Sequence, residues 1–140
     1  MPSSTSKPPL ESPVFFIDRS LSKNTFARSF ATAGVKCELH DNHFPPDTPD
    51  TVWIRAVAAR GWVILTVDKR IRYNPPEKKA FLTAKAYAFM LATRHPLKAV
   101  EMADIYLRSV ETMTEALRKH TAPMIFKVYQ DGRVELWLSD

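Results

Sequence analysis

The sequence contains a single cysteine, Cys37, and only three glycines among its 140 residues. One cysteine cannot form an intramolecular disulfide, so a disulfide-stapled secreted domain is excluded. A cysteine-based zinc site, which needs several thiolates, is excluded for the same reason. Three scattered glycines cannot form a glycine-rich phosphate-binding loop, and the sequence has no Gly-x-Ser-x-Gly elbow. No apolar run approaches the roughly 20 residues that cross a bilayer. We therefore expect a protein of the reducing cytoplasm without a membrane segment.

The composition is that of an ordinary globular protein, with 45% hydrophobic and 25% charged residues. Residues 1–13 are rich in serine and proline and lack the apolar stretch of a signal peptide, so we expect a flexible tail there. The length then fits one domain over residues 14–140. The formal net charge of +5 permits an acidic partner such as nucleic acid but does not require one.

Apolar runs alternate with amphipathic segments through the first two thirds of the chain. We expect strands over residues 14–17, 35–39, 62–67 and 86–91. Helices are expected over residues 22–33, 48–60 and 77–83, with a basic loop over 69–76. Alternation of this kind is typical of an α/β fold, in which a parallel sheet carries helices on both faces. The carboxyl ends of all these strands should then lie at one edge of the sheet.

The last third of the chain has a different pattern. Residues 98–119 carry one apolar stripe with helical spacing, which predicts a single long helix. That stripe packs either on the core of its own domain or on a dimer or partner surface. Residues 124–129 and 134–138 flank Asp131-Gly132, a pair typical of a tight β-hairpin turn.

Several aspartates are placed where the ends of the predicted elements meet. Asp18 and Asp68 each directly follow a buried strand, and Asp50 lies in the first turn of the helix that precedes the second of these strands. Asp47 lies in the loop before that helix and is a further candidate. Because open α/β sheets bind ligands at the carboxyl edge, we expect these side chains to gather there. Thr66, two residues before Asp68 on the same strand face, is a candidate supporting residue.

Carboxylates that lie a few ångströms apart repel one another unless a cation intervenes. Mg²⁺ prefers oxygen ligands and keeps several waters, so a few carboxylates suffice to hold it, and Mn²⁺ also suits such a site. A metal of this kind polarises a phosphate and lowers the pKa of a bound water. Each aspartate also has a purely structural interpretation as a turn or helix-dipole residue.

Basic residues follow both strand-terminal acids and are candidates for binding the phosphates of RNA. They are Arg19, Lys23, Lys69, Arg70 and Arg72. Tyr73 and Phe44 could stack on a base. The alternative for these charges is a solvated loop.

A second, weaker candidate is the segment His40-Asp41-Asn42-His43, which offers two histidines to a transition metal. No further cluster of histidine or cysteine completes a ligand set.

Three motifs together resemble the PIN-like domain group, and within it the VapC-type toxins of toxin–antitoxin pairs. They are Phe15-Phe16-Ile17-Asp18-Arg19-Ser20, Phe44-Pro45-Pro46-Asp47-Thr48-Pro49-Asp50 and Gly61-Trp62-Val63-Ile64-Leu65-Thr66-Val67-Asp68-Lys69-Arg70-Ile71-Arg72. The resemblance implies a three-layer α/β/α fold and a Mg²⁺- or Mn²⁺-dependent ribonuclease with an acidic site at the sheet edge. By position, Asp18, Asp50 and Asp68 match the acids of that site. Toxins of this kind are held inactive by a small antitoxin protein and often form homodimers.

The sequence departs from the family pattern at one point. PIN nucleases usually carry a fourth acid shortly after the position of Asp68, but here the next acid is Glu77. Either Asp47 substitutes or the site has three acids, which leaves open the number of metals. The departure also leaves open a degenerate module that binds RNA or a protein without cutting. A phosphatase or receiver domain is a third alternative, although each of those needs a second acid close to Asp18.

Overall fold

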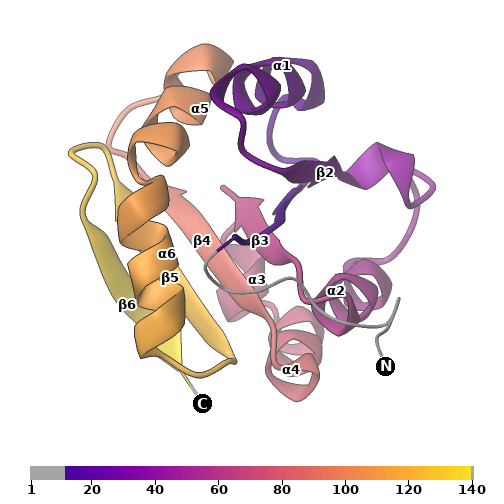
Figure 1. The fold of residues 1–140 in the computed structure, drawn as a ribbon. Coiled ribbons are helices and arrows are strands. Elements are labelled where there is room, and N and C mark those ends of the chain that lie inside the picture. Colours follow the sequence, from indigo (N-terminus) through magenta and orange to yellow (C-terminus); the bar gives the residue numbers. More distant parts are fainter. Residues whose placement is uncertain (1–11, 140) are drawn as a thin grey trace, which may run out of the picture.

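The computed structural model describes residues 12–139, so the tail expected over residues 1–13 falls almost entirely outside the described residues. Helices and strands alternate along the chain (Figure 1). In order, they are β1 (Phe15–Ile17), α1 (Lys23–Ala33), β2 (Cys37–Leu39), η1 (His40–Asn42), α2 (Asp50–Ala59), β3 (Val63–Thr66), α3 (Arg70–Tyr73), α4 (Pro75–Ala84), β4 (Tyr87–Ala92), α5 (Ala99–Arg108), α6 (Val110–Lys119), β5 (Met124–Tyr129) and β6 (Val134–Ser139).

The strands of the described residues form one sheet in the order β2-β1-β3-β4-β5-β6. Every neighbouring pair is parallel except β5 and β6, which form the antiparallel hairpin predicted around Asp131-Gly132. In the register, Phe16 of β1 lies opposite Ile64 of β3. Consequently, the residues that follow β1 and β3 emerge side by side at the carboxyl edge.

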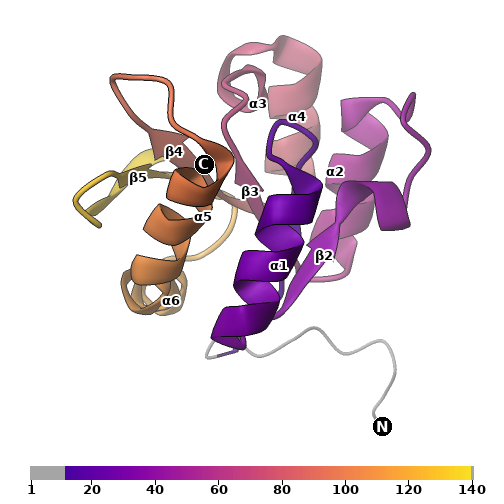
Figure 2. The ribbon, with the colours of Figure 1, turned by 90° about the horizontal axis from the view of Figure 1, so that it is seen from above.

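Helices cover both faces of the sheet, which gives three layers (Figure 2). Side chains alternate along each strand, so Phe15 and Leu65 pack against α1, α5 and α6, whereas Phe16 and Ile64 pack against α2, α3 and α4. All four side chains are fully buried. The predicted α/β class with a mainly parallel sheet and three layers is confirmed.

The single helix predicted over residues 98–119 is wrong in one respect, because it is divided into α5 and α6 at Ser109. Ser109 is fully buried, and its Oγ donates to the carbonyl oxygen of Ile105 at 2.7 Å. A serine that bonds back to the preceding turn bends a helix. The apolar stripe nevertheless continues across the break, and its residues Tyr106, Met113 and Leu117 are buried in the core of the same chain.

Two local predictions also need correction. The expected basic loop over residues 69–76 contains the short helix α3 and the first turn of α4. The helix expected from residue 48 begins at Asp50: Thr48 lies before it and donates its hydroxyl to the carbonyl oxygen of Pro45 at 2.8 Å, and Pro49 occupies the N-cap position. In residues 12–139, no helix combines the length and the apolar character needed to cross a membrane.

Candidate functional site

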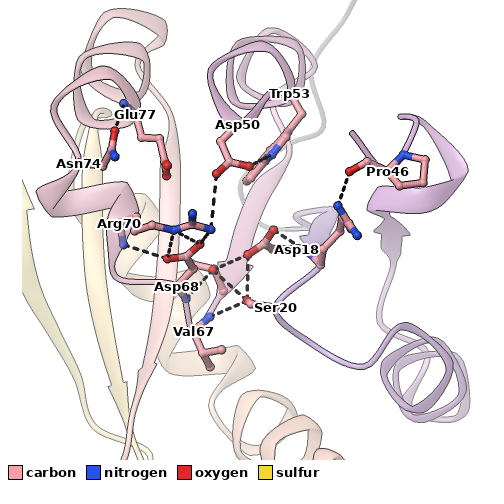
Figure 3. Close-up of polar contacts among 12 residues, drawn as sticks. Asp18, Ser20, Pro46, Asp50, Trp53, Val67, Asp68, Arg70, Asn74 and Glu77 are labelled. Carbon is pink, nitrogen blue, oxygen red and sulfur yellow. Dashed lines mark hydrogen bonds and ion pairs between the residues drawn. The ribbon is translucent and has the colours of Figure 1, made fainter. Parts of the chain in front are cut away.

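Three of the predicted acids come together at the carboxyl edge of the sheet (Figure 3). Asp18 follows β1, Asp68 follows β3 and Asp50 is the first residue of α2. All three line a cavity of about 280 Å³ that is open to solvent, and the same three line a smaller pocket beside it together with Glu77. The topology therefore places carboxylates that are as much as 50 residues apart in the sequence around one cavity.

The closest group of acids consists of Asp50, Asp68 and Glu77. One carboxylate oxygen of each lies within 4.8 Å of the others. The guanidinium group of Arg70 lies over this group: its Nε and Nη2 donate to Asp68 at 2.6–3.0 Å, and Nη2 is 3.8 Å from Oδ2 of Asp50. These bonds hold the pKa of Asp68 below its usual range, because they stabilise the ionised carboxylate.

Glu77 is the acid that the sequence reasoning did not include in the site. Asn74 caps α4 through its side chain, which accepts the backbone N–H of Glu77 at 3.4 Å, and two prolines follow the cap. Glu77 thereby lies in the first helical turn, and its side chain is 8% exposed. Burial and the neighbouring charge of Asp50 raise the pKa of Glu77 to about 7. The Asn-Pro-Pro helix start was the available signal for this placement.

Asp18 is held by a separate hydrogen-bond network. Its Oδ2 accepts from Thr66 Oγ1 at 2.6 Å and from Ser20 Oγ at 2.9 Å, and its Oδ1 accepts the backbone N–H of Arg19 at 2.7 Å. The hydroxyl of Thr66 in turn accepts the backbone N–H of Asp68 at 2.9 Å. Thr66 therefore links the two strand-terminal acids, the contact that its expected supporting role requires. Ser20 was not recognised from the sequence, where nothing marked it except its position two residues after Asp18.

Trp53 fixes the third acid. Its indole N–H donates to Oδ1 of Asp50 at 2.8 Å, one turn along α2. The indole ring is buried and stacks on Phe16, so the hydrogen bond fixes the carboxylate of Asp50 relative to the core of the sheet. All three predicted acids are therefore oriented by neighbouring groups before any ligand is present.

Asp47, the further predicted ligand, is exposed in the loop before α2 and lines neither of the two cavities that the other acids share. The histidine segment has other contacts. His40 is buried against Phe16, Phe44 and Trp53, and Nε2 of His43 lies 2.7 Å from a carboxylate oxygen of Glu38. The acid cluster of the described residues contains neither histidine.

The predicted basic residues are distributed around the acids. Arg19 and Arg70 line the same open cavity as the acids. The side chain of Arg19 donates to the carbonyl oxygen of Pro46, and Lys23 pairs with Asp41 at 2.7 Å. Lys69 is exposed beside Asp68.

Arg72 points away toward the hairpin. It lies over the rings of Tyr73 and Trp137, with its guanidinium carbon 5.1 and 4.7 Å from the ring centres.

The donor set of this site is entirely oxygen. Clustered carboxylates of this type fit a hard divalent cation such as Mg²⁺ or Mn²⁺. Burial and, after it, the charge of Asp50 raise the pKa of Glu77, and Arg70 supplies one positive charge at the same place. A divalent cation would neutralise the carboxylate charge that one arginine leaves uncompensated.

The comparisons with known proteins agree with this arrangement. Residues 13–93, more than half of the chain, match the sequence model of the PIN like domain family. A search of curated proteins found no match, and a search of solved structures found none either. The matched segment contains β1 to β4 and all four carboxylates of the edge site. On the basis of this match, the chain belongs to the PIN like domain family.

Proposed function

We propose that this protein is a metal-dependent endoribonuclease that hydrolyses phosphodiester bonds of RNA. Family membership indicates a nuclease-type function. The observation that carries the proposal is the convergence of Asp50, Asp68 and Glu77 to within 4.8 Å, with Asp18 lining the same cavity. These four carboxylates would hold Mg²⁺ or Mn²⁺.

The residues of the chain have distinct tasks in this proposal. Thr66 and Ser20 orient Asp18, Trp53 orients Asp50, and Arg70 keeps Asp68 ionised. When bound, the cation would polarise the scissile phosphate and lower the pKa of a water molecule. Exposed cations near the acids, Arg19 and Lys69, would hold neighbouring phosphates.

The direct test is cleavage of a labelled single-stranded RNA with Mg²⁺ or Mn²⁺ and with excess chelator. We expect cleavage only with the metal, and we expect Asp18→Asn and Asp68→Asn to abolish it. Asp104→Asn is a matched control, because Asp104 is an exposed acid of α5 whose ion pair within residues 12–139 is with Arg108 of its own helix. Undiminished cleavage by both site variants, with folding verified by circular dichroism, would overturn the assignment.

The toxin role is a finer part of the proposal and rests on the resemblance to VapC-type toxins. It includes a small antitoxin as partner, a homodimer and a cytoplasmic location. Expression in a bacterial host should arrest growth, and Asp68→Asn should relieve the arrest. Normal growth with the active wild-type protein would remove the toxin role and leave the nuclease proposal in place.

A non-cleaving module that binds RNA or a protein is the second candidate. One contact favours it: Arg70 already donates to both carboxylate oxygens of Asp68, where a cation would bind. Calorimetric titration with Mn²⁺ separates the two candidates. Saturable binding supports the nuclease, whereas no detectable binding supports the non-cleaving module.

A further inference from the structure

A second cavity lies at the carboxyl edge of the sheet, on the side of β4 and the hairpin. Its volume is about 730 Å³, and it is open to solvent. Its floor includes Val67 and Leu91, which lie at the ends of β3 and β4, and its walls include Arg94 from the following loop and Lys127 and Trp137 from the hairpin. We call this cavity the hairpin groove. Because β5 and β6 lie beyond residue 93, the segment shared with the family does not build it alone.

The lining of the hairpin groove is positively charged. Four cations face it, namely Lys69, Arg94, Lys127 and Arg133, and no carboxylate is among its described lining residues. Within residues 12–139, only Arg133 of these four forms an ion pair, with the exposed Asp131 at 3.1 Å. Uncompensated charge of one sign in a concave site attracts a ligand of the opposite sign, here a polyanion.

Aromatic rings line the same groove. Tyr73 is 60% exposed and meets Trp137 edge to face, with the ring centres 5.6 Å apart. A third ring, Tyr129, also lines the groove. Cations lie over two of the three rings: Nζ of Lys127 is 4.7 Å from the centre of Trp137, and the guanidinium carbon of Arg133 is 4.3 Å from the centre of Tyr129. Aromatic faces interleaved with cations are the features that bind single-stranded nucleic acid, because bases stack while phosphates pair.

The hairpin groove lies beside the acid site, because neighbouring residues of one backbone segment line the two cavities. Val67 lines the groove, and its N–H donates at 3.1 Å to Ser20 Oγ, which itself bonds Asp18 (Figure 3). Asp68 lines the acid cavity, and the next residue, Lys69, lines the groove again. A ligand strand bound at the acids would therefore need to cross only this segment to reach the groove.

We propose that the hairpin groove binds the single-stranded RNA that flanks the scissile phosphate, with bases against Tyr73 and Trp137 and phosphates on Lys127 and Arg133. This inference rests on the proposed nuclease function and assigns part of its substrate path, Lys127, Arg133 and Trp137, to residues outside the family segment. A single strand fits better than a duplex, in which the bases already stack on one another. An acidic peptide would satisfy the cations but would present no flat bases to the rings.

The test is equilibrium binding of a fluorescein-labelled 12-nucleotide oligouridylate, measured by anisotropy in excess chelator so that no cleavage occurs. The variants are the double substitution K127Q/R133Q and, separately, Tyr73→Leu. The matched control is R28Q/K36Q, which also removes one arginine and one lysine. Arg28 is exposed in α1, and Lys36 is exposed directly before β2. Lys36 lies at the amino end of its strand, opposite the groove.

We expect K127Q/R133Q to weaken binding by about tenfold, and to reduce the slope of log affinity against log salt by about 1.4, which is about 0.7 for each lost phosphate contact. Tyr73→Leu should weaken binding by roughly five- to 100-fold through lost stacking. R28Q/K36Q should leave the affinity within about twofold of the wild type. A 4-thiouridine version of the oligonucleotide should crosslink to residues 67–73 or 127–137, a readout that needs no variant.

Equal affinities for wild type, K127Q/R133Q and Tyr73→Leu would overturn the inference, as would crosslinks confined to other segments. An acidic peptide that binds the wild type while the oligouridylate does not would overturn it in favour of a protein partner. Because binding is measured without metal, these outcomes are independent of the cleavage test. If the protein binds RNA in the groove but does not cleave it, the nuclease proposal is refuted and the groove inference stands.

Discussion

Two cavities lie next to each other along the carboxyl edge of one sheet, and their linings have opposite charge. The acid cavity gathers Asp18, Asp50 and Asp68 above β1 and β3. The hairpin groove, above β4 and β5, gathers cations and aromatic rings, with no carboxylate among its described lining residues. The residues that separate them are Val67, Asp68 and Lys69. The strand order brings the two charge types together, although all the acids of the site precede residue 80 and the groove needs residues 127–137.

The difference between the two linings indicates that the two regions have different functions. In the acid cavity, the carboxylates are held by hydrogen bonds from neighbouring side chains, such as Thr66 to Asp18 and Trp53 to Asp50. The hairpin groove has long cationic side chains, of which Lys69, Arg94 and Arg133 are exposed and can adapt to a ligand. The first region is suited to chemistry at a fixed point, and the second to holding a variable strand. Substitutions in one region therefore test whether the other region responds.

The largest effect is expected from Glu77→Gln. The substitution removes one of the three clustered carboxylates and should weaken Mn²⁺ binding by about 100-fold or more, since even indirect ligand contacts contribute roughly 10–100-fold. Calorimetry measures the change. Glu111→Gln, at an exposed acid of α6, is the control. Oligouridylate binding in chelator should not change, and an unchanged Mn²⁺ affinity would exclude Glu77 from the site.

Tyr106→Phe should lower the free energy of unfolding by about 2 kcal/mol. The buried hydroxyl donates to the carbonyl oxygens of Thr66 at 3.0 Å and Phe89 at 3.1 Å, so it supports the strand below each cavity. Urea denaturation measures the loss. Tyr129→Phe should cost much less, because its hydroxyl bonds the exposed Glu135 and no other group of the described residues. Equal costs for the two variants would show that Tyr106 is not a shared support.

Thr66→Val keeps the shape of the side chain but removes the donor to Asp18 and the acceptor for the N–H of Asp68. We expect RNA cleavage to fall by about tenfold, in the range for groups that orient metal ligands. Groove binding in chelator should be unaffected. Thr83→Val, at an exposed position of α4, is the control. Full activity of Thr66→Val would mean that Asp18 needs no orientation by this hydroxyl.

The stability of the metal-free protein should depend on pH. The pKa of Glu77 is about 7 in the folded chain and 4.5 for an ordinary glutamate, so between these values the folded state binds more protons than the unfolded state. The stabilising contribution is therefore fully present below about pH 4.5 and is lost as the pH rises to about 7. The slope is at most about 1.4 kcal/mol per pH unit. Urea denaturation in chelator should show this slope for wild type and not for Glu77→Gln.

Much of this architecture could be predicted from local patterns. The uninterrupted apolar runs that end at Asp18 and Asp68 predicted both the parallel strands and the common edge of these acids. Glu77 was missed because it follows Asp68 by nine residues and lies beyond the expected basic loop, at the start of an expected helix, whereas the Asn74 cap starts α4 two residues earlier than expected. The break at Ser109 was invisible in the apolar spacing, since it depends on burial of one hydroxyl by tertiary packing. The hairpin groove could not be predicted without knowing the strand order, because its lining residues Arg94 and Lys127 are more than 30 residues apart in the sequence.

The pairing of β4 has a consequence for how this protein should be divided. All six residues of β4 pair with β5, from Tyr87 with Met124 to Ala92 with Tyr129. A fragment that ended at residue 93, where the family match ends, would leave β4 as an unprotected edge strand with an apolar sequence. Such edges template intermolecular pairing and aggregation. The segment that matches the family is thus shorter than the unit in which β4 is paired on both sides, and β5 completes that unit.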